Sequence, residues 1–151
     1  VSDIISLHCP LTTDTYHIID KAAVDKMKKG VVIINTSRGA LIDADVLLEE
    51  IKSRKIGAAC LDVYEEESDL FFEDYSGHIV NDDVLARLMT MPNVLITSHQ
   101  AFLTSEALSN IADTTLDNID KYFNEDKLEN EVCYHCDRQD DCKKKRNGKC
   151  F

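Results

Sequence analysis

Short apolar runs alternate with amphipathic segments along the first part of the chain. The most distinct run is residues 31–34, four consecutive Val and Ile residues that follow Gly30 and precede a polar stretch closed by Gly39. A run of this length and composition is typical of a strand buried on both faces, and it is too short for a buried helix. Comparable patterns predict the following strands: 2–7, 31–36, 58–63 and 94–97.

Helical patterns separate these strands. Apolar residues at helical spacing predict three helices: 21–29, 44–54 and 83–89. Asp20 and Asp43 are in position to cap the first two. We expect Gly30 to end the first helix and Gly57 to end the connection that follows the second.

The order of the elements predicts the fold class. Strand and helix alternate four times without a hairpin signal, which is typical of an α/β fold with a parallel sheet, right-handed crossovers and helices on its faces. After the last strand, Thr104 can cap a long helix in which apolar residues such as Leu108, Ile111 and Phe123 recur at spacings of three and four.

Composition and charge exclude several function classes. The chain is 44% hydrophobic and 30% charged, as in soluble globular domains, and no apolar run approaches the roughly 18 residues of a membrane span. Its net charge of −11 argues against binding to nucleic acid or to an anionic membrane surface. The chain opens with neither Met nor a signal-peptide pattern, so we expect a piece of a longer, cytoplasmic protein.

Residues with useful chemistry follow each predicted strand. They fall in four short segments: 8–10, 36–38, 62–67 and 98–99. Parallel strands bring their carboxyl ends to one edge of a sheet, where ligands bind. Each of these groups, taken alone, has a purely structural interpretation. Arg38 could be a surface turn residue, the glutamates at 65–67 could form a solvated loop, and His99 could be a histidine near the core. Their joint placement favours a catalytic site instead.

The residue types suggest how such a site would work. The Arg38 guanidinium is permanently charged and can bind a substrate carboxylate through two parallel hydrogen bonds. The His99 imidazole can exchange a proton with a hydroxyl group near neutral pH, and a neighbouring carboxylate would orient the ring. These groups suit an anionic substrate whose carbonyl becomes a hydroxyl. They cannot supply a hydride, so a cofactor is required.

These motifs resemble those of the NAD-dependent D-isomer-specific 2-hydroxyacid dehydrogenase family over residues 1–130. Three blocks match the family pattern: 8–12, 35–43 and 62–65. Two further blocks are most similar to the fermentative D-lactate dehydrogenase subgroup: 69–74 and 99–104.

The resemblance implies an arrangement of the whole chain in three parts. Residues 1–100 would be the carboxyl-terminal half of an NAD-binding, Rossmann-like domain with a doubly wound parallel sheet. Residues 101–132 would form a helix returning to a substrate domain, and residues 133–151 a cysteine-rich basic tail. The full-length protein would be a homo-oligomer.

The resemblance also implies catalytic roles for a reaction that converts pyruvate to D-lactate. Arg38 would bind the carboxylate and carbonyl of the substrate. His99 would protonate the carbonyl oxygen while NADH delivers a hydride. Glu67 would be the partner of His99, although the two glutamates before it are close enough to be tested for this role. Phe102 would line the pocket near the substrate methyl group.

Cofactor contacts follow from the same resemblance. The residues concerned are Cys9, Pro10, Thr15, Thr36, Ser37, Arg38 and Asp62. Asp62 could instead be only a turn residue at the end of a strand. The glycine-rich turn that binds pyrophosphate is absent, as is the acidic residue that would select NAD over its phosphorylated form. We therefore expect little or no turnover from this chain alone.

The tail has its own pattern. Residues 133–151 carry six basic and three acidic side chains and four cysteines: Cys133, Cys136, Cys142 and Cys150. Four thiolates at this spacing can bind zinc or an iron–sulfur cluster, and a reducing compartment favours metal over disulfides. Disordered reactive thiols are the alternative.

Two other functions remain open. The chain could belong to a dehydrogenase for a larger D-2-hydroxy acid, in which Phe102 borders a roomier pocket. It could also be an NAD-sensing binding module, like the co-repressor relatives of this family.

Overall fold

The computed structural model describes residues 1–65, 82–124, 128 and 130–132. The chain divides into two compact units, Val1–Phe102 and Leu103–Phe151. The first unit contains the sheet and its helices, and the second contains a single long helix among the described residues.

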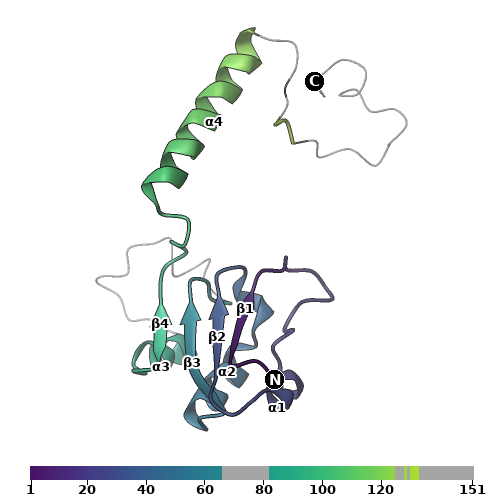
Figure 1. Ribbon diagram of the computed structural model, residues 1–151, viewed down its shortest axis with the longest axis vertical. Helices are drawn as coiled ribbons and strands as arrows, with labels where there is room; N and C mark the ends of the chain where they lie inside the picture. Colours follow the sequence, from purple (N-terminus) through teal and green to yellow (C-terminus); the bar gives the residue numbers. More distant parts are fainter. Residues whose placement is uncertain (66–81, 125–127, 129, 133–151) are drawn as a thin grey trace. The chain divides into compact units, whose positions relative to one another are not determined.

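The first unit is built on four parallel strands in the order β1-β2-β3-β4 (Figure 1). The strands are β1 (Ile4–Leu7), β2 (Val31–Asn35), β3 (Ile56–Leu61) and β4 (Val94–Ile96). The connections contain α1 (Lys21–Lys26), the short 3₁₀ helix η1 (Gly39–Leu41), α2 (Ala44–Lys52) and α3 (Asp83–Met89). The predicted α/β fold with a parallel sheet is confirmed.

The two faces of this sheet differ in burial. Val31, Ile33 and Leu61 on one face are buried and pack with the helices in a single apolar core. On the other face Ile4 and Leu95 are 60% and 61% exposed. Each strand lies beside the next in the sequence, so right-handed crossovers put all three helices on one face. The expected helices on both faces are therefore not present in the described residues.

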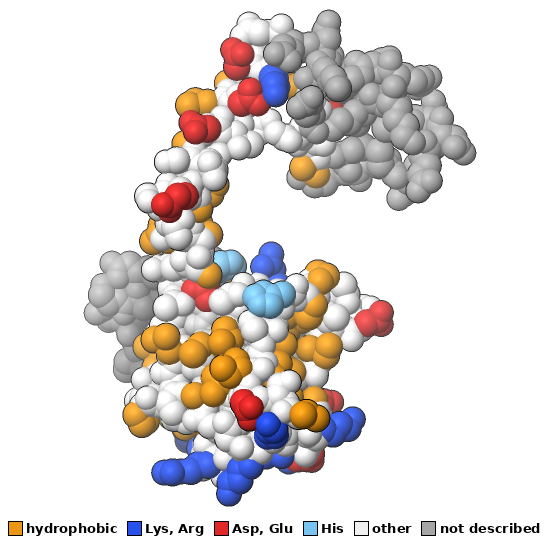
Figure 2. All heavy atoms as spheres, viewed as in Figure 1, with side chains coloured by type: hydrophobic (Ala, Val, Ile, Leu, Met, Phe, Trp, Pro, Cys, Tyr) orange, Lys and Arg blue, Asp and Glu red, His pale blue; other side chains and the backbone are white. Residues whose placement is uncertain are grey.

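The open face of the sheet is apolar. The strand register aligns side chains on this face that are exposed or only partly buried: Ile4, Val32, Ile34, Ala58, Cys60 and Leu95. Figure 2 shows hydrophobic side chains gathered over the strands. The described helices of this unit thus leave one apolar face of the sheet uncovered.

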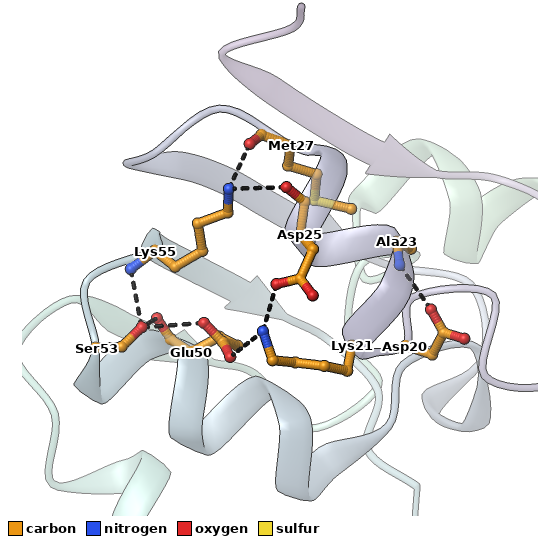
Figure 3. Close-up of polar contacts among 8 residues, drawn as sticks. All are labelled: Asp20, Lys21, Ala23, Asp25, Met27, Glu50, Ser53 and Lys55. Carbon is orange, nitrogen blue, oxygen red and sulfur yellow. Dashed lines mark hydrogen bonds and ion pairs between the residues drawn. The ribbon is translucent and has the colours of Figure 1, made fainter.

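Helix α1 is shorter than predicted because other elements determine its end. Its cap Asp20 accepts a hydrogen bond from the Ala23 N–H, as expected. At the other end the Lys55 ammonium group donates to the Met27 carbonyl at 2.6 Å and to that of Asp25 at 3.3 Å (Figure 3). These contacts satisfy carbonyls that the end of the helix leaves without a partner inside the helix.

The predicted role of Gly57 was wrong. This glycine lies within β3, which begins at Ile56. A Cβ atom at Gly57 would lie 2.6 Å from the Gly30 carbonyl oxygen, so the strand requires a residue without a side chain there. Gly30 itself has φ of +81° and turns the chain after α1.

The other predicted ends differ slightly from the observed ones. Helix α2 ends at Lys52, two residues earlier than expected, and β2 and β4 are each one residue shorter. Strand β1 begins at Ile4 rather than at residue 2. The predicted helix at 83–89 is confirmed.

The second unit contains α4 (Ser105–Asn124). Its predicted cap is confirmed, since the Ala107 N–H donates to the Thr104 hydroxyl at 3.1 Å. Apolar side chains along the helix, including Ile111, Leu116 and Phe123, are exposed. Among the helices of the described part of the chain, none combines the length and apolar character needed to cross a membrane.

Candidate functional site

The four strands of the first unit end at the same level. Leu7 pairs with Asn35, Asn35 with Leu61, and Leu61 with Ile96. The segments that follow these residues therefore leave the sheet from one edge, as the sequence predicted. Arg38 follows β2 and His99 follows β4, so both lie at this edge.

A buried amide shapes the turn that carries Arg38. The Asn35 side chain is fully buried, and its Nδ2 donates to the Arg38 carbonyl at 2.9 Å while its Oδ1 accepts from the Ser37 N–H at 3.1 Å. The Ser37 hydroxyl donates to the Cys9 carbonyl at 2.6 Å, which joins this turn to the segment after β1. The exposed Arg38 guanidinium donates to the Ser37 carbonyl at 2.7 Å. The backbone of Arg38 is thus fixed while its side chain remains accessible.

The segment that carries His99 is held by Asp62, which directly follows β3. Asp62 Oδ1 accepts hydrogen bonds from the Thr97 hydroxyl and from the Gln100 N–H at 2.8 Å. Its Oδ2 accepts from the Ala101 N–H, also at 2.8 Å. The His99 N–H donates to the Asp62 carbonyl at 2.7 Å. One aspartate therefore binds both sides of the histidine.

His99 adopts a backbone conformation that side-chain-bearing residues rarely use. Its φ is +50°, in the left-handed region, and its Nδ1 atom is buried. Such a conformation costs roughly 1–3 kcal/mol and persists where the surroundings impose it. Here the contacts to Asp62 impose it, so the direction of the imidazole depends on that carboxylate.

Asp62 is ionised although it is only 4% exposed. Burial alone would raise its pKa, but the hydrogen bonds from Thr97, Ala101 and Gln100 and the proximity of His99 outweigh burial and lower the pKa below its usual value. The turn-residue interpretation of Asp62 thus has direct structural support. Its expected contact with a cofactor stays a prediction.

The other predicted cofactor residues lie in the segment after β1 or beside Arg38. The Thr15 hydroxyl donates to the Pro10 carbonyl at 2.7 Å, which closes a loop next to Cys9. Thr36 is exposed at the end of β2, and Phe102 is 52% exposed at the end of the first unit. Thr36 and Phe102 are therefore accessible to a ligand.

Glu65 is the last described residue before the acidic segment, and its carboxylate lies beside His17. The distance from His17 Nε2 to Glu65 Oε1 is 2.6 Å, and the Tyr16 hydroxyl donates to the same oxygen at 3.3 Å. We did not predict a role for His17, which lies in a polar loop without a recognisable motif. Glu67, the expected partner of His99, lies outside the described residues.

The cysteines proposed as metal ligands also lie outside the described residues: Cys133, Cys136, Cys142 and Cys150. Within the described part of the chain, no cluster of three or more His, Cys, Asp or Glu side chains has the arrangement of a metal site.

The chain matches one family model, described as D-isomer specific 2-hydroxyacid dehydrogenase, NAD binding domain, over residues 1–101. It is 53% identical over 131 residues to a D-lactate dehydrogenase of Escherichia coli K12, covering 87% of this chain and 40% of that protein. It is 51% identical over 121 residues to an aromatic 2-oxoacid reductase of Clostridium sporogenes, covering 80% of this chain and 37% of that protein.

A solved structure supports the same comparison. The pyruvate reductase of Chlamydomonas reinhardtii superposes with a TM-score of 0.79 at 46% identity, covering 85% of this chain and 40% of that one. The chain thus spans about two fifths of the length of the proteins to which it is similar.

Proposed function

This chain belongs to the D-isomer-specific 2-hydroxyacid dehydrogenase family, as part of its NAD-binding domain, and from this premise we propose a reaction for the full-length protein. The protein uses NADH to reduce a small 2-oxo acid, pyruvate first of all, to the D-2-hydroxy acid. The observation that carries this proposal is the joint placement of Arg38 and His99. Both follow parallel strands that end at one level, and each sits in a turn held by a buried polar side chain.

The sheet edge fits the nicotinamide end of the cofactor. Thr36 is exposed there, and the hydrogen bond from the Ser37 hydroxyl to the Cys9 carbonyl joins the segments that follow β1 and β2. The glycine-rich turn for the pyrophosphate has no counterpart in this chain, so that part of the cofactor requires residues beyond it. When bound, NADH supplies the hydride.

Arg38 and His99 divide the remaining chemistry. Arg38 binds the substrate carboxylate through its rigid pair of N–H donors, which orients the carbonyl. His99 in its protonated form donates a proton to the carbonyl oxygen as that oxygen becomes a hydroxyl. Glu67 is proposed as the carboxylate that stabilises the protonated ring; this role rests on the family resemblance, since Glu67 is not described.

Two substitutions test this mechanism in the full-length protein. His99→Gln removes the proton donor, and we expect kcat/KM for pyruvate to fall by about 10²–10⁴-fold, the usual contribution of a general acid. Arg38→Lys keeps the charge but loses the paired donors, so KM for the 2-oxo acid should rise much more than KM for NADH. The control is Arg87→Lys, at an exposed position near the end of α3, which should leave both constants unchanged. Wild-type activity in both substituted proteins would contradict the mechanism.

A larger substrate is the second candidate. The similarity to an aromatic 2-oxoacid reductase favours it, as does the exposed Phe102. Comparing kcat/KM for pyruvate and phenylpyruvate decides between the two substrates. A protein that binds NADH but reduces neither would be an NAD-sensing module instead.

Three further properties are proposed for the full-length protein. It forms a homo-oligomer, it is located in the cytoplasm, and its four tail cysteines bind zinc or an iron–sulfur cluster. The first two rest on the family resemblance and composition, and the third on cysteine spacing alone.

A further inference from the structure

A second cluster of ionisable groups lies at the same sheet edge, around a histidine that has no part in the proposed reaction. His17, in the segment after β1, lies between two carboxylates from other segments. Its Nε2 is 2.6 Å from Glu65 Oε1, and its Nδ1 is 3.7 Å from Asp43 Oδ2. All three side chains are only 20–30% exposed, so solvent screens these contacts less than it would at an open surface. The Tyr16 ring stacks on the imidazole with a centroid distance of 3.9 Å.

The backbone of His17 is strained, and the residues after Arg38 hold it in place. Its φ is +50°, which is unfavourable for a residue with a side chain. Its N–H donates to the Ala40 carbonyl at 2.9 Å, and the Ile19 N–H donates to the Leu41 carbonyl at 3.0 Å. The segment that carries His17 is thus paired with the residues that directly follow Arg38.

Gly39, at the start of η1, also packs directly against the segment after β3. A Cβ atom at Gly39 would lie 2.0 Å from both the carbonyl carbon and the carbonyl oxygen of Tyr64. The backbone after Arg38 and the backbone before Glu65 are therefore in direct contact. His17 completes this arrangement because its ring reaches Glu65 while its N–H binds the η1 segment.

We propose that His17 is a positioning residue that acts through Glu65: the contact holds the segment after β3 against the turn that carries Arg38. This inference rests on the proposed function. Glu65 is the last described residue after β3, so the contact fixes the end of this segment beside the turn that carries Arg38. Loss of the contact misplaces the groups around the substrate without removing any of them.

The experiment compares His17→Leu, His17→Gln and Glu65→Gln in the full-length protein. Leucine cannot donate a hydrogen bond, whereas the glutamine amide can place a donor near the position of Nε2. Glu65→Gln weakens the same contact from the other side. We measure kcat, KM for the 2-oxo acid and KM for NADH, with active protein counted by NADH titration, together with the thermal unfolding temperature.

We expect His17→Leu to lower kcat by about 10-fold or more, because small displacements at a reaction centre are costly. KM for NADH should stay within about 3-fold of wild type, and His17→Gln should recover most of kcat. Glu65→Gln keeps an oxygen that can accept from His17, so it should lower kcat less than His17→Leu does, and the His17→Leu, Glu65→Gln double variant should be no worse than His17→Leu alone.

The outcomes separate the two proposals. If wild type reduces 2-oxo acids and both His17→Leu and Glu65→Gln keep full kcat, the positioning role is wrong, whether or not their unfolding temperatures fall. If His17→Leu does not fold, His17→Ala takes its place in the same comparison, because alanine also removes the ring that contacts Glu65. If wild type reduces no 2-oxo acid, the proposed function fails first and the positioning role fails with it.

Discussion

Replacing Asp62 with asparagine tests whether this residue holds the segment of His99. In the folded protein both carboxylate oxygens accept hydrogen bonds, one from Thr97 and Gln100 and the other from Ala101. Asparagine has nearly the same shape but offers one oxygen and one NH₂ group. Whichever way the amide turns, its NH₂ faces a backbone N–H, so at least one bond is lost.

The size of the effect follows from these contacts. A hydrogen bond to a charged acceptor contributes about 1.5–3 kcal/mol, and those that remain would be to a neutral oxygen. We therefore expect Asp62→Asn to lower the free energy of unfolding by about 2–3 kcal/mol. For a unit of roughly 100 residues this corresponds to a fall in Tm of about 10–20 °C.

The pH dependence gives a second, independent signature. The pKa of Asp62 in the folded protein is lower than its usual value of 3.8, so its ionised form is favoured by folding. Its contribution to stability is present in full above pH 3.8 and is lost as the pH falls through the folded-state pKa. The difference between wild type and Asp62→Asn should therefore be constant from neutral pH to about pH 5 and shrink only in stronger acid.

The assay is urea unfolding of this chain without cofactor, followed by circular dichroism at several pH values. Asp20→Asn is the matched control, because Asp20 caps α1 at an exposed position where asparagine serves equally well. A loss below about 0.5 kcal/mol for Asp62→Asn, similar to that of the control, would refute the reasoning.

Three further predictions concern other parts of the chain. Gly39→Ala should destabilise the protein by at least about 3 kcal/mol in urea unfolding, since its Cβ would overlap the backbone after β3. Gly30→Ala should cost only about 1–2 kcal/mol, because a Cβ there meets open space and the cost comes from the φ of +81°. Equal losses in the two variants would contradict this. Lys55→Met should cost about 1 kcal/mol because it removes the donor to the carbonyls at the end of α1, and Lys52→Met, at an exposed ion pair, should change stability by less than 0.5 kcal/mol. If the tail 133–151 binds a metal, elemental analysis after dialysis should find zinc or iron in stoichiometric amount, and its absence would end that hypothesis.

Local sequence determined the type and order of the elements. The run at 31–34 forms β2 as predicted, although only one face of that strand is buried and not both, and the caps of α1 and α4 depend on residues within three positions of the helix start. Element ends were predicted less accurately, because they depend on partners far away in the sequence. The end of α1 is set by Lys55, and the position of Gly57 in β3 by its close contact with Gly30.

The sequence by itself also determined that Arg38 and His99 share one edge, since this follows from parallel strand order alone. Only the tertiary structure decided how the edge is held together. Asp62 reaches the Gln100 N–H across 38 positions and His17 reaches Glu65 across 48. Such contacts exist only once the strands are aligned and the segments at their ends are packed. No local pattern of apolar or capping residues encodes these contacts, because their partners lie far apart in the sequence.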